Sequence, residues 1–155
     1  MIRVRAASLA VALLAVGVLA GCALAGSSDA VTRATLRLDG VEFRPELALH
    51  PEARSLGLMR RSRAPEDGML FAFPWPTNGG FWMKHTRIPL RIVFYDVHGR
   101  RVRELRMRPC RRSPCRVYKP GRWYRFALEL AVKDPRPARR LGPRAELYRL
   151  THRAR

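Results

Sequence analysis

YRFALEL (residues 124–130) alternates large apolar side chains with smaller or polar ones, which is the pattern of a β-strand. Successive side chains of a strand point to opposite faces of a sheet. One face would therefore carry Tyr124, Phe126, Leu128 and Leu130, and the other Arg125, Ala127 and Glu129. A strand with so large an apolar face needs partners, so we expect further strands in the flanking sequence.

The sequence before this stretch contains more strand candidates, separated by turn-forming residues. Short apolar or alternating runs predict strands over 69–73, 81–86, 90–96 and 101–107. The first should stop at Pro74, because proline has no backbone N–H to give to a sheet. Nearer the N-terminus, TLRLDGVEF (35–43) alternates on both sides of Asp39-Gly40, which predicts a hairpin. ELAL (46–49) continues as a strand.

Helical signals are weaker. HPEARSLGLM (50–59) has Pro51 at a first helical position and Leu56 and Met59 three residues apart, which predicts a short helix. The segment 133–142 predicts a helical turn, and AELYRL (145–150) a final strand. The fold class that follows is mainly β, or α+β with small helices, in a compact antiparallel sandwich or barrel-like domain.

The N-terminal residues predict export. Arg3 and Arg5 precede an uncharged run that ends at LAGC (19–22), as in a secretory signal. These four residues look like the lipobox of bacterial lipoproteins, which implies lipidation of Cys22. We expect a signal peptide over 1–21, a lipidated cysteine with a short tether over 22–34, and one β-rich domain over 35–155. The protein would be lipid-anchored on the extracytoplasmic side of the bacterial cell envelope.

The composition is strongly basic, with 31 Lys and Arg residues against 12 Asp and Glu and a net charge of +19. Almost all of the cations are arginine, a bias that GC-rich codons produce without any nucleic-acid partner. An exported protein seldom meets nucleic acid and no recognition module is visible, so we expect none. Anionic lipid headgroups or an envelope polymer are the partners that such a surface favours. The sequence leaves the oligomeric state open.

The other two cysteines, Cys110 and Cys115, are close in the sequence. In an oxidising compartment a structural disulfide is the preferred interpretation. A redox pair is an alternative, although such motifs usually have two intervening residues rather than four. Half of a metal site is another, but no second pair completes it.

The blocks GLM (57–59), GMLF (68–71) and FWM (81–83) occur in an order that resembles the bacterial family known as domain of unknown function 192. The resemblance covers nearly all of 36–150. It implies a compact, mainly antiparallel β fold and leaves the activity open. Two departures stand out: Arg91 follows IPL where members usually have aspartate, and His85 stands where asparagine is common. A usual glycine-aspartate turn before the last strand is also missing from GPRAE (142–146).

The candidate binding residues are Trp82, Lys84, His85 and Thr86. Period-two alternation places Phe81, Met83 and His85 on one face of a strand and Trp82, Lys84 and Thr86 on the other. If Phe81 and Met83 face the core, Trp82 is a stacking surface for a sugar or peptide. If Trp82 faces the core instead, it is a structural aromatic residue, which is the more common role of tryptophan.

Three classes of function follow. An envelope-tethered binding or structural module is favoured, with no catalytic residue, metal ligand or cofactor identified. A hydrolase or transferase is the alternative; no serine has a nucleophile motif, but Asp96 and Glu129 could form a carboxylate pair. A Cu(I) site from Met59, Met69, Met83 and His85 is a third, because methionine sulfur suits soft metals. Methionines in such positions more often fill the core.

Overall fold

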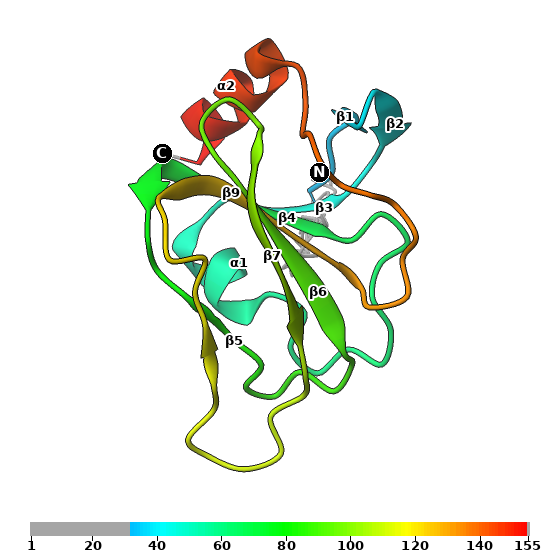
Figure 1. The fold of residues 1–155 in the computed structure, drawn as a ribbon, viewed down its shortest axis with the longest axis vertical. Coiled ribbons are helices and arrows are strands. Elements are labelled where there is room, and N and C mark those ends of the chain that lie inside the picture. The colour runs from blue at the N-terminus through cyan, green and yellow to red at the C-terminus, as the bar shows by residue number, and fades with distance from the viewer. Residues whose placement is uncertain (1–31, 155) are drawn as a thin grey trace, which may run out of the picture.

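A computed structural model describes residues 32–154, and the predicted signal peptide and Cys22 lie outside them. The domain is mainly β, as the sequence predicts, and is built on a five-stranded sheet in the order β3-β4-β9-β6-β7 (Figure 1). These strands span Glu46–Ala48, Met69–Thr77, Tyr124–Ala131, Leu90–Tyr95 and Arg101–Met107. All neighbours pair antiparallel except β3 and β4, which pair parallel. No helix among residues 32–154 is both long and apolar enough to span a bilayer.

The predicted strand 124–130 is the central strand, β9, and both of its faces are buried. Phe126, Leu128 and Leu130 pack in one core cluster, whereas Ala127 lies in a second cluster on the opposite face. Tyr124 belongs to the second cluster too, so the prediction that it shares a face with Phe126 is wrong. The reason is an irregularity in the pairing of β4 with β9 between Ala72 and Thr77, which changes the alternation there.

β4 does not stop at Pro74 as predicted but continues to Thr77. Its partner β3 pairs only with Met69, Leu70 and Phe71. Beyond Phe71, β4 has no neighbour on that side, and an edge position does not require a backbone N–H from Pro74 or Pro76.

One face of the sheet is covered by the hairpin β1 (Leu36–Leu38) and β2 (Val41–Phe43) together with α2 (Arg144–Arg153). The hairpin is confirmed, and Asp39 and Gly40 have the positive φ values of 51° and 86° that its turn requires. The carboxylate of Asp39 accepts hydrogen bonds from the backbone N–H groups of Arg139 and Arg140. The turn therefore fixes the segment that leads to α2.

Two predictions for the C-terminal segment are wrong. Residues 145–150 are not a strand but part of α2, in which Leu147, Leu150 and Thr151 are buried. Leu150 and Thr151 lie three and four residues after Leu147, which places all three on one helical face, as a strand could not. Residues 133–142 form no helical turn; they run as a loop in which buried Ala138 accepts a hydrogen bond from the Tyr95 hydroxyl at 3.0 Å.

The opposite face of the sheet is covered by α1 (Pro51–Leu56) and the small sheet of β5 (Phe81–Trp82) and β8 (Val117–Tyr118). Pro51 begins α1 as predicted, but the helix ends before Gly57 rather than reaching Met59. β5 is likewise shorter than the predicted strand 81–86. The chain after these two elements shapes the pockets described next.

Candidate functional site

The segment Phe81–Thr86 leaves its strand after Trp82 and turns. Phe81 is half-buried and Met83 is 1% exposed, so these two residues face the core. Trp82 is 51% exposed, and the Lys84 Nζ lies 5.4 Å from the centroid of its ring. This is a cation–π contact, and it holds an aromatic surface and a positive charge side by side in solvent.

His85 and Thr86 do not extend the exposed surface of Trp82 and Lys84, because His85 lines a different hollow and Thr86 is buried. The Thr86 N–H donates to the Met83 carbonyl at 3.1 Å, which closes a turn, and His85 takes a positive φ of 55°. Thr86 is only 6% exposed, and its hydroxyl donates to the Lys84 carbonyl at 3.4 Å. The alternation predicted over 81–86 therefore fails after Met83, because the chain is no longer extended there.

Trp82 lies at a hollow of about 360 Å³ between α1 and β5, which we call the Trp82 pocket. Its lining includes the rings of Phe71, Phe73, Phe81 and Tyr124. These rings contact one another edge to face, with Phe71 and Phe81 at 4.9 Å and Phe73 and Tyr124 at 5.6 Å between centroids. Burial raises the pKa of Tyr124, whose hydroxyl donates to the Gly79 carbonyl at 3.1 Å.

The helix α1 supplies the polar side of the Trp82 pocket through Arg54 and Ser55. The Arg54 guanidinium lies 5.2 Å from the Phe73 centroid and donates to the carbonyl oxygens of Leu49 and Ala72. A rigid cation thus stands beside the aromatic lining. Neither Arg54 nor Ser55 was predicted as a site residue, because nothing in the sequence places α1 against β5.

A small inner cavity of about 30 Å³ adjoins the Trp82 pocket and shares Arg54, Ser55 and Trp82 with it. Glu129 of β9 lines this cavity. The residue is 5% exposed, and its carboxyl group has no hydrogen bond or ion pair to any residue within 32–154. Burial raises its pKa to about 8. At neutral pH Glu129 therefore carries a proton and can donate a hydrogen bond to an oxygen in the cavity.

The carboxylate pair considered for Asp96 and Glu129 does not exist. Glu129 pairs across the sheet with Ile92, whereas Asp96 lies beyond the end of β6. Asp96 instead accepts hydrogen bonds from the backbone N–H groups of His98 and Arg100, at 2.8 and 2.9 Å. Its role is to close a turn.

Arg91, at a position where the family resemblance implies aspartate, lies on the face of β6 opposite to Ile92. It is 6% exposed and pairs with Glu104 at 3.0 Å and with Asp134 at 3.5 Å. Arg91 therefore has a structural role away from the Trp82 pocket. The substitution of aspartate by arginine at this position does not remove a side chain from the lining of that pocket.

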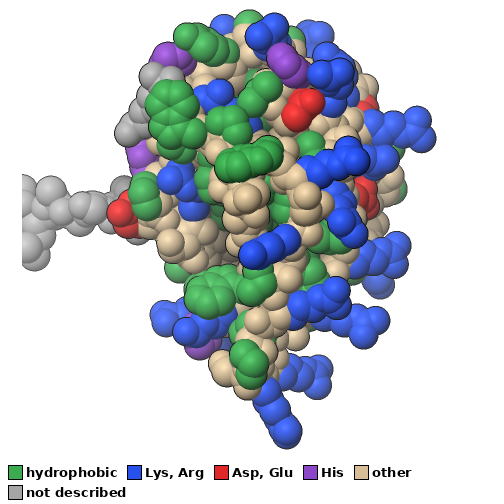
Figure 2. Space-filling view, turned by 60° about the vertical axis from the view of Figure 1, so that its left-hand side comes forward, with side chains coloured by type: hydrophobic (Ala, Val, Ile, Leu, Met, Phe, Trp, Pro, Cys, Tyr) green, Lys and Arg blue, Asp and Glu red, His purple; other side chains and the backbone are tan. Residues whose placement is uncertain are grey.

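His85 lines a separate hollow of about 380 Å³, which we call the basic pocket. Its charged lining residues are Arg60, Arg87 and Arg111, and no carboxylate contributes to it. Figure 2 shows one face of the domain, on which many Lys and Arg side chains project and acidic ones are few.

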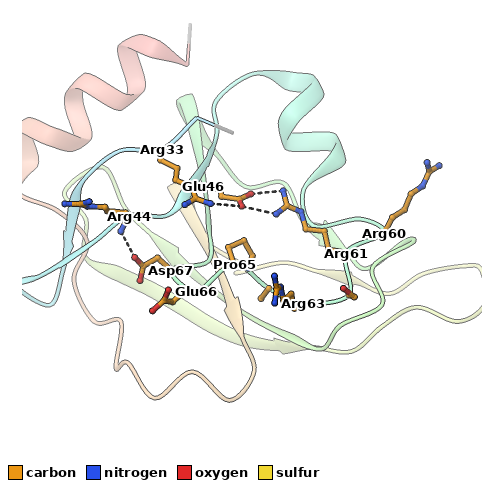
Figure 3. A pocket seen from close by; sticks show the side chains of 11 residues that line it. Arg33, Arg44, Glu46, Arg60, Arg61, Arg63, Pro65, Glu66 and Asp67 are labelled. Atoms are coloured by element: carbon orange, nitrogen blue, oxygen red, sulfur yellow. Dashed lines mark hydrogen bonds and ion pairs between the residues drawn. The ribbon is translucent and has the colours of Figure 1, made fainter. Parts of the chain in front are cut away.

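A larger hollow of about 890 Å³ adjoins the basic pocket at Arg60 but has a mixed charge (Figure 3). Its centre is Glu46, which is 5% exposed. The two oxygens of Glu46 hold the Arg61 guanidinium at 3.0 and 2.7 Å, and Arg33 approaches at 3.5 Å. Because the buried carboxylate of Glu46 is already paired with Arg61 and Arg33, we regard this hollow as a structural ion-pair cluster.

The predicted pair Cys110 and Cys115 is joined by a disulfide, with the Cα atoms 5.6 Å apart. For the Cu(I) alternative, Met69 and Met83 are core residues. Met59 lines the inner cavity and His85 the basic pocket, so these four side chains do not form one site. Within residues 32–154 there is no group of three or more His, Cys, Asp or Glu residues placed to hold a metal.

The model of the family DUF192, described as an uncharacterized ACR, matches residues 34–134. No curated protein matches the chain. A crystal structure from Sinorhizobium meliloti 1021, for which a role as a transcription regulator has been suggested, is similar at 27% identity and a TM-score of 0.57, over 70% of this chain and 88% of that one. A protein of unknown function from Novosphingobium aromaticivorans DSM 12444 shares the fold, with 24% identity and a TM-score of 0.51 over 66% of this chain and 82% of that one.

Proposed function

This chain belongs to the DUF192 family, and we propose that it is a lipid-anchored module of the bacterial cell envelope that binds an anionic partner. The observation that carries the proposal is the exposed Trp82, in contact with Lys84 at the rim of a pocket lined by aromatic rings. A tryptophan with half of its surface in water costs solubility without contributing much to the core. A role in stacking on a sugar ring or a peptide accounts for it.

The charges around the Trp82 pocket suit a partner with acidic groups. Lys84 lies over the Trp82 ring, and Arg54 stands on the α1 side of the hollow. A ligand that stacks on Trp82 would therefore meet cations on both sides, while protonated Glu129 offers a hydrogen-bond donor farther in. Cell-wall glycans with acidic substituents have this combination of sugar rings and negative charge.

A hydrolase or transferase is the second candidate, and one observation favours it. Glu129, with its raised pKa, lines the same inner cavity as the hydroxyl-bearing residues Ser55 and Thr86. A carboxyl group that titrates near pH 8 is suited to general acid chemistry. We place this candidate second because the hydroxyl of Thr86 already bonds to a backbone carbonyl, and Ser55 has no base bonded to it within residues 32–154.

The membrane anchor is tested by the Cys22→Ser variant. We expect it to lose lipid labelling completely, because serine has no sulfur to accept the diacylglycerol group. Metabolic labelling with a clickable fatty acid, followed by fractionation of membranes, is the measurement. Equal labelling of the parent chain and the variant would show that Cys22 is not the lipidation site.

The Trp82 pocket is tested by Trp82→Ala and Lys84→Ala. Both side chains are exposed, so we expect each substitution to change the free energy of unfolding by less than about 0.5 kcal/mol. Binding to purified cell-wall glycan should weaken in both, by roughly 30-fold for Trp82→Ala if it is a binding hot spot. The assay is co-sedimentation at a salt concentration that screens the arginine surface.

The matched control is Trp123→Ala, since Trp123 is 64% exposed and lies outside the lining of the Trp82 pocket. It should bind cell-wall glycan like the parent chain. If Trp82→Ala instead lowers the free energy of unfolding by about 3–5 kcal/mol while Lys84→Ala has no effect, Trp82 is a core residue and the proposed binding role is wrong.

A further inference from the structure

The basic pocket concentrates positive charge without compensation. Arg60, Arg87 and Arg111 come from three segments that are distant in the sequence: the chain after α1, the turn before β6 and the disulfide loop. None of the three makes an ion pair with a carboxylate among residues 32–154, although several other arginines do. Three like charges around one hollow repel one another, so an anion between them would be stabilised.

Arg60 is separated from the acidic residues of the neighbouring hollow. Figure 3 shows its side chain extending away from Glu46, Glu66 and Asp67, whereas Arg61 turns toward Glu46. The two consecutive arginines thus have different environments. Arg61 forms an ion pair with the buried Glu46, whereas Arg60 lines the basic pocket.

The backbone of the basic pocket is held in an unfavourable conformation. Arg60 and His85 have φ values of 64° and 55°, in the left-handed region that L-residues with a side chain rarely adopt. The Arg60 N–H donates to the His85 carbonyl at 2.8 Å, so the two strained residues are bonded to each other. Strained residues that cluster in one place are typical of functional sites, because the fold must support their cost.

The disulfide loop, residues 110–115, forms the third side of the basic pocket. Cys110 lines the basic pocket, and its N–H donates to the Met83 carbonyl at 3.4 Å. The bond to Cys115 closes the loop that carries Arg111. The loop is therefore tied both to itself and to the turn that positions His85, which keeps Arg111 beside the other two cations.

We propose that the basic pocket binds a phosphate group. This inference rests on the proposed function, since it names a chemical group of the anionic partner and a second place where that partner is held. A phosphate ester presents several oxygens in a tetrahedral arrangement and one or two negative charges. Three guanidinium groups that approach from three segments match that shape and charge better than they match a planar carboxylate. A soluble phosphate ester and a phospholipid headgroup both supply this group.

The test uses the full chain purified in a non-ionic detergent, with glycerol 3-phosphate as the soluble probe. Titration calorimetry should show saturable binding to the parent chain. The double variant Arg87→Ala/Arg111→Ala should weaken that binding at least tenfold. The control, Arg37→Ala/Arg149→Ala, removes the same charge from exposed positions that do not line the basic pocket. It should stay within about twofold of the parent chain.

Vesicles distinguish the two sources of phosphate. If the chain binds phosphatidylglycerol vesicles more tightly than phosphatidylcholine vesicles, by a margin that depends on Arg87 and Arg111, and glycerol 3-phosphate does not bind, the phosphate is that of a lipid headgroup. Binding of glycerol 3-phosphate assigns the pocket to soluble esters. Equal losses in both double variants, or no saturable binding of any probe, would overturn the inference. Normal glycan binding by Trp82→Ala would contradict the proposed function alone and leave the phosphate result standing.

Discussion

The Glu129→Gln variant is expected to be more stable than the parent chain at pH 8 and to lose most of the parent's pH dependence between about pH 4.5 and 8. Burial raises the pKa of Glu129 from 4.5 to about 8. The folded chain therefore keeps its proton throughout this window, whereas the unfolded chain has released it. Unfolding releases a proton, so the free energy of unfolding falls as the pH rises.

The slope from this one group is at most about 1.4 kcal/mol per pH unit, which amounts to roughly 3–5 kcal/mol over the whole window. Below the pKa that Glu129 has in the unfolded chain, both states are protonated, and the ionisation of Glu129 takes nothing from the free energy of unfolding. Above the folded pKa both states are ionised and the slope vanishes. Glutamine keeps the size and polarity of the side chain but has no proton to lose. The Glu129→Gln variant should therefore lack this contribution to the pH dependence of the free energy of unfolding.

Urea unfolding of both chains at pH 5, 6.5 and 8 measures the effect. The difference between the two chains removes the contribution of every other titrating group. Glu52→Gln is the control, because Glu52 is an exposed acid on the same side of the sheet. Its curve should run parallel to that of the parent. If the Glu129→Gln curve is parallel as well, the Glu129 carboxyl ionises normally and is not enclosed as described.

Local patterns were sufficient for the elements that carry the sheet. The alternation around Asp39-Gly40 and the apolar runs at 69–73 and 90–96 predict strands that the structure contains. They were insufficient at the C-terminus, where AELYRL (145–150) contains both a period-two and a period-three pattern. The burial of Leu147 and Leu150 on one helical face depends on the core cluster beneath α2, which sequence periodicity does not reveal.

The candidate site was predictable only in part, for a similar reason. The sequence singles out Trp82 and Lys84, and it states the condition for their exposure, namely that Phe81 and Met83 face the core. It does not reveal that Glu129 lies behind Trp82, because the two residues are brought together by the packing of α1 and β5 on β9. It also could not separate Arg60 from Arg61, which differ only in how the chain turns after Leu58.

A Gly68→Ala substitution should destabilise the domain by about 2–5 kcal/mol, far more than a change of one methyl group suggests. Gly68 begins the GMLF block and has a φ of 72°. A Cβ there would lie 2.2 Å from the backbone oxygen of Glu129 and 2.8 Å from the Leu130 side chain. The left-handed conformation alone costs an L-residue about 1–2 kcal/mol, and the overlap adds about 1–3 kcal/mol.

Gly40→Ala separates these two contributions. Gly40 has a φ of 86°, but a Cβ there meets nothing within 4 Å. The Gly40→Ala substitution should therefore cost only the free energy of the left-handed conformation. Urea unfolding should show that Gly68→Ala is much less stable than Gly40→Ala. Equal losses would mean that β4 and β9 adjust to the added carbon. If the losses differ, we expect that the overlap displaces β9 at the carbonyl of Glu129, that water reaches the inner cavity, and that the pKa of Glu129 falls toward its ordinary value. The pH dependence of the Gly68→Ala variant should therefore be flatter than that of the parent, which links the glycine of the GMLF block to the buried acid behind Trp82.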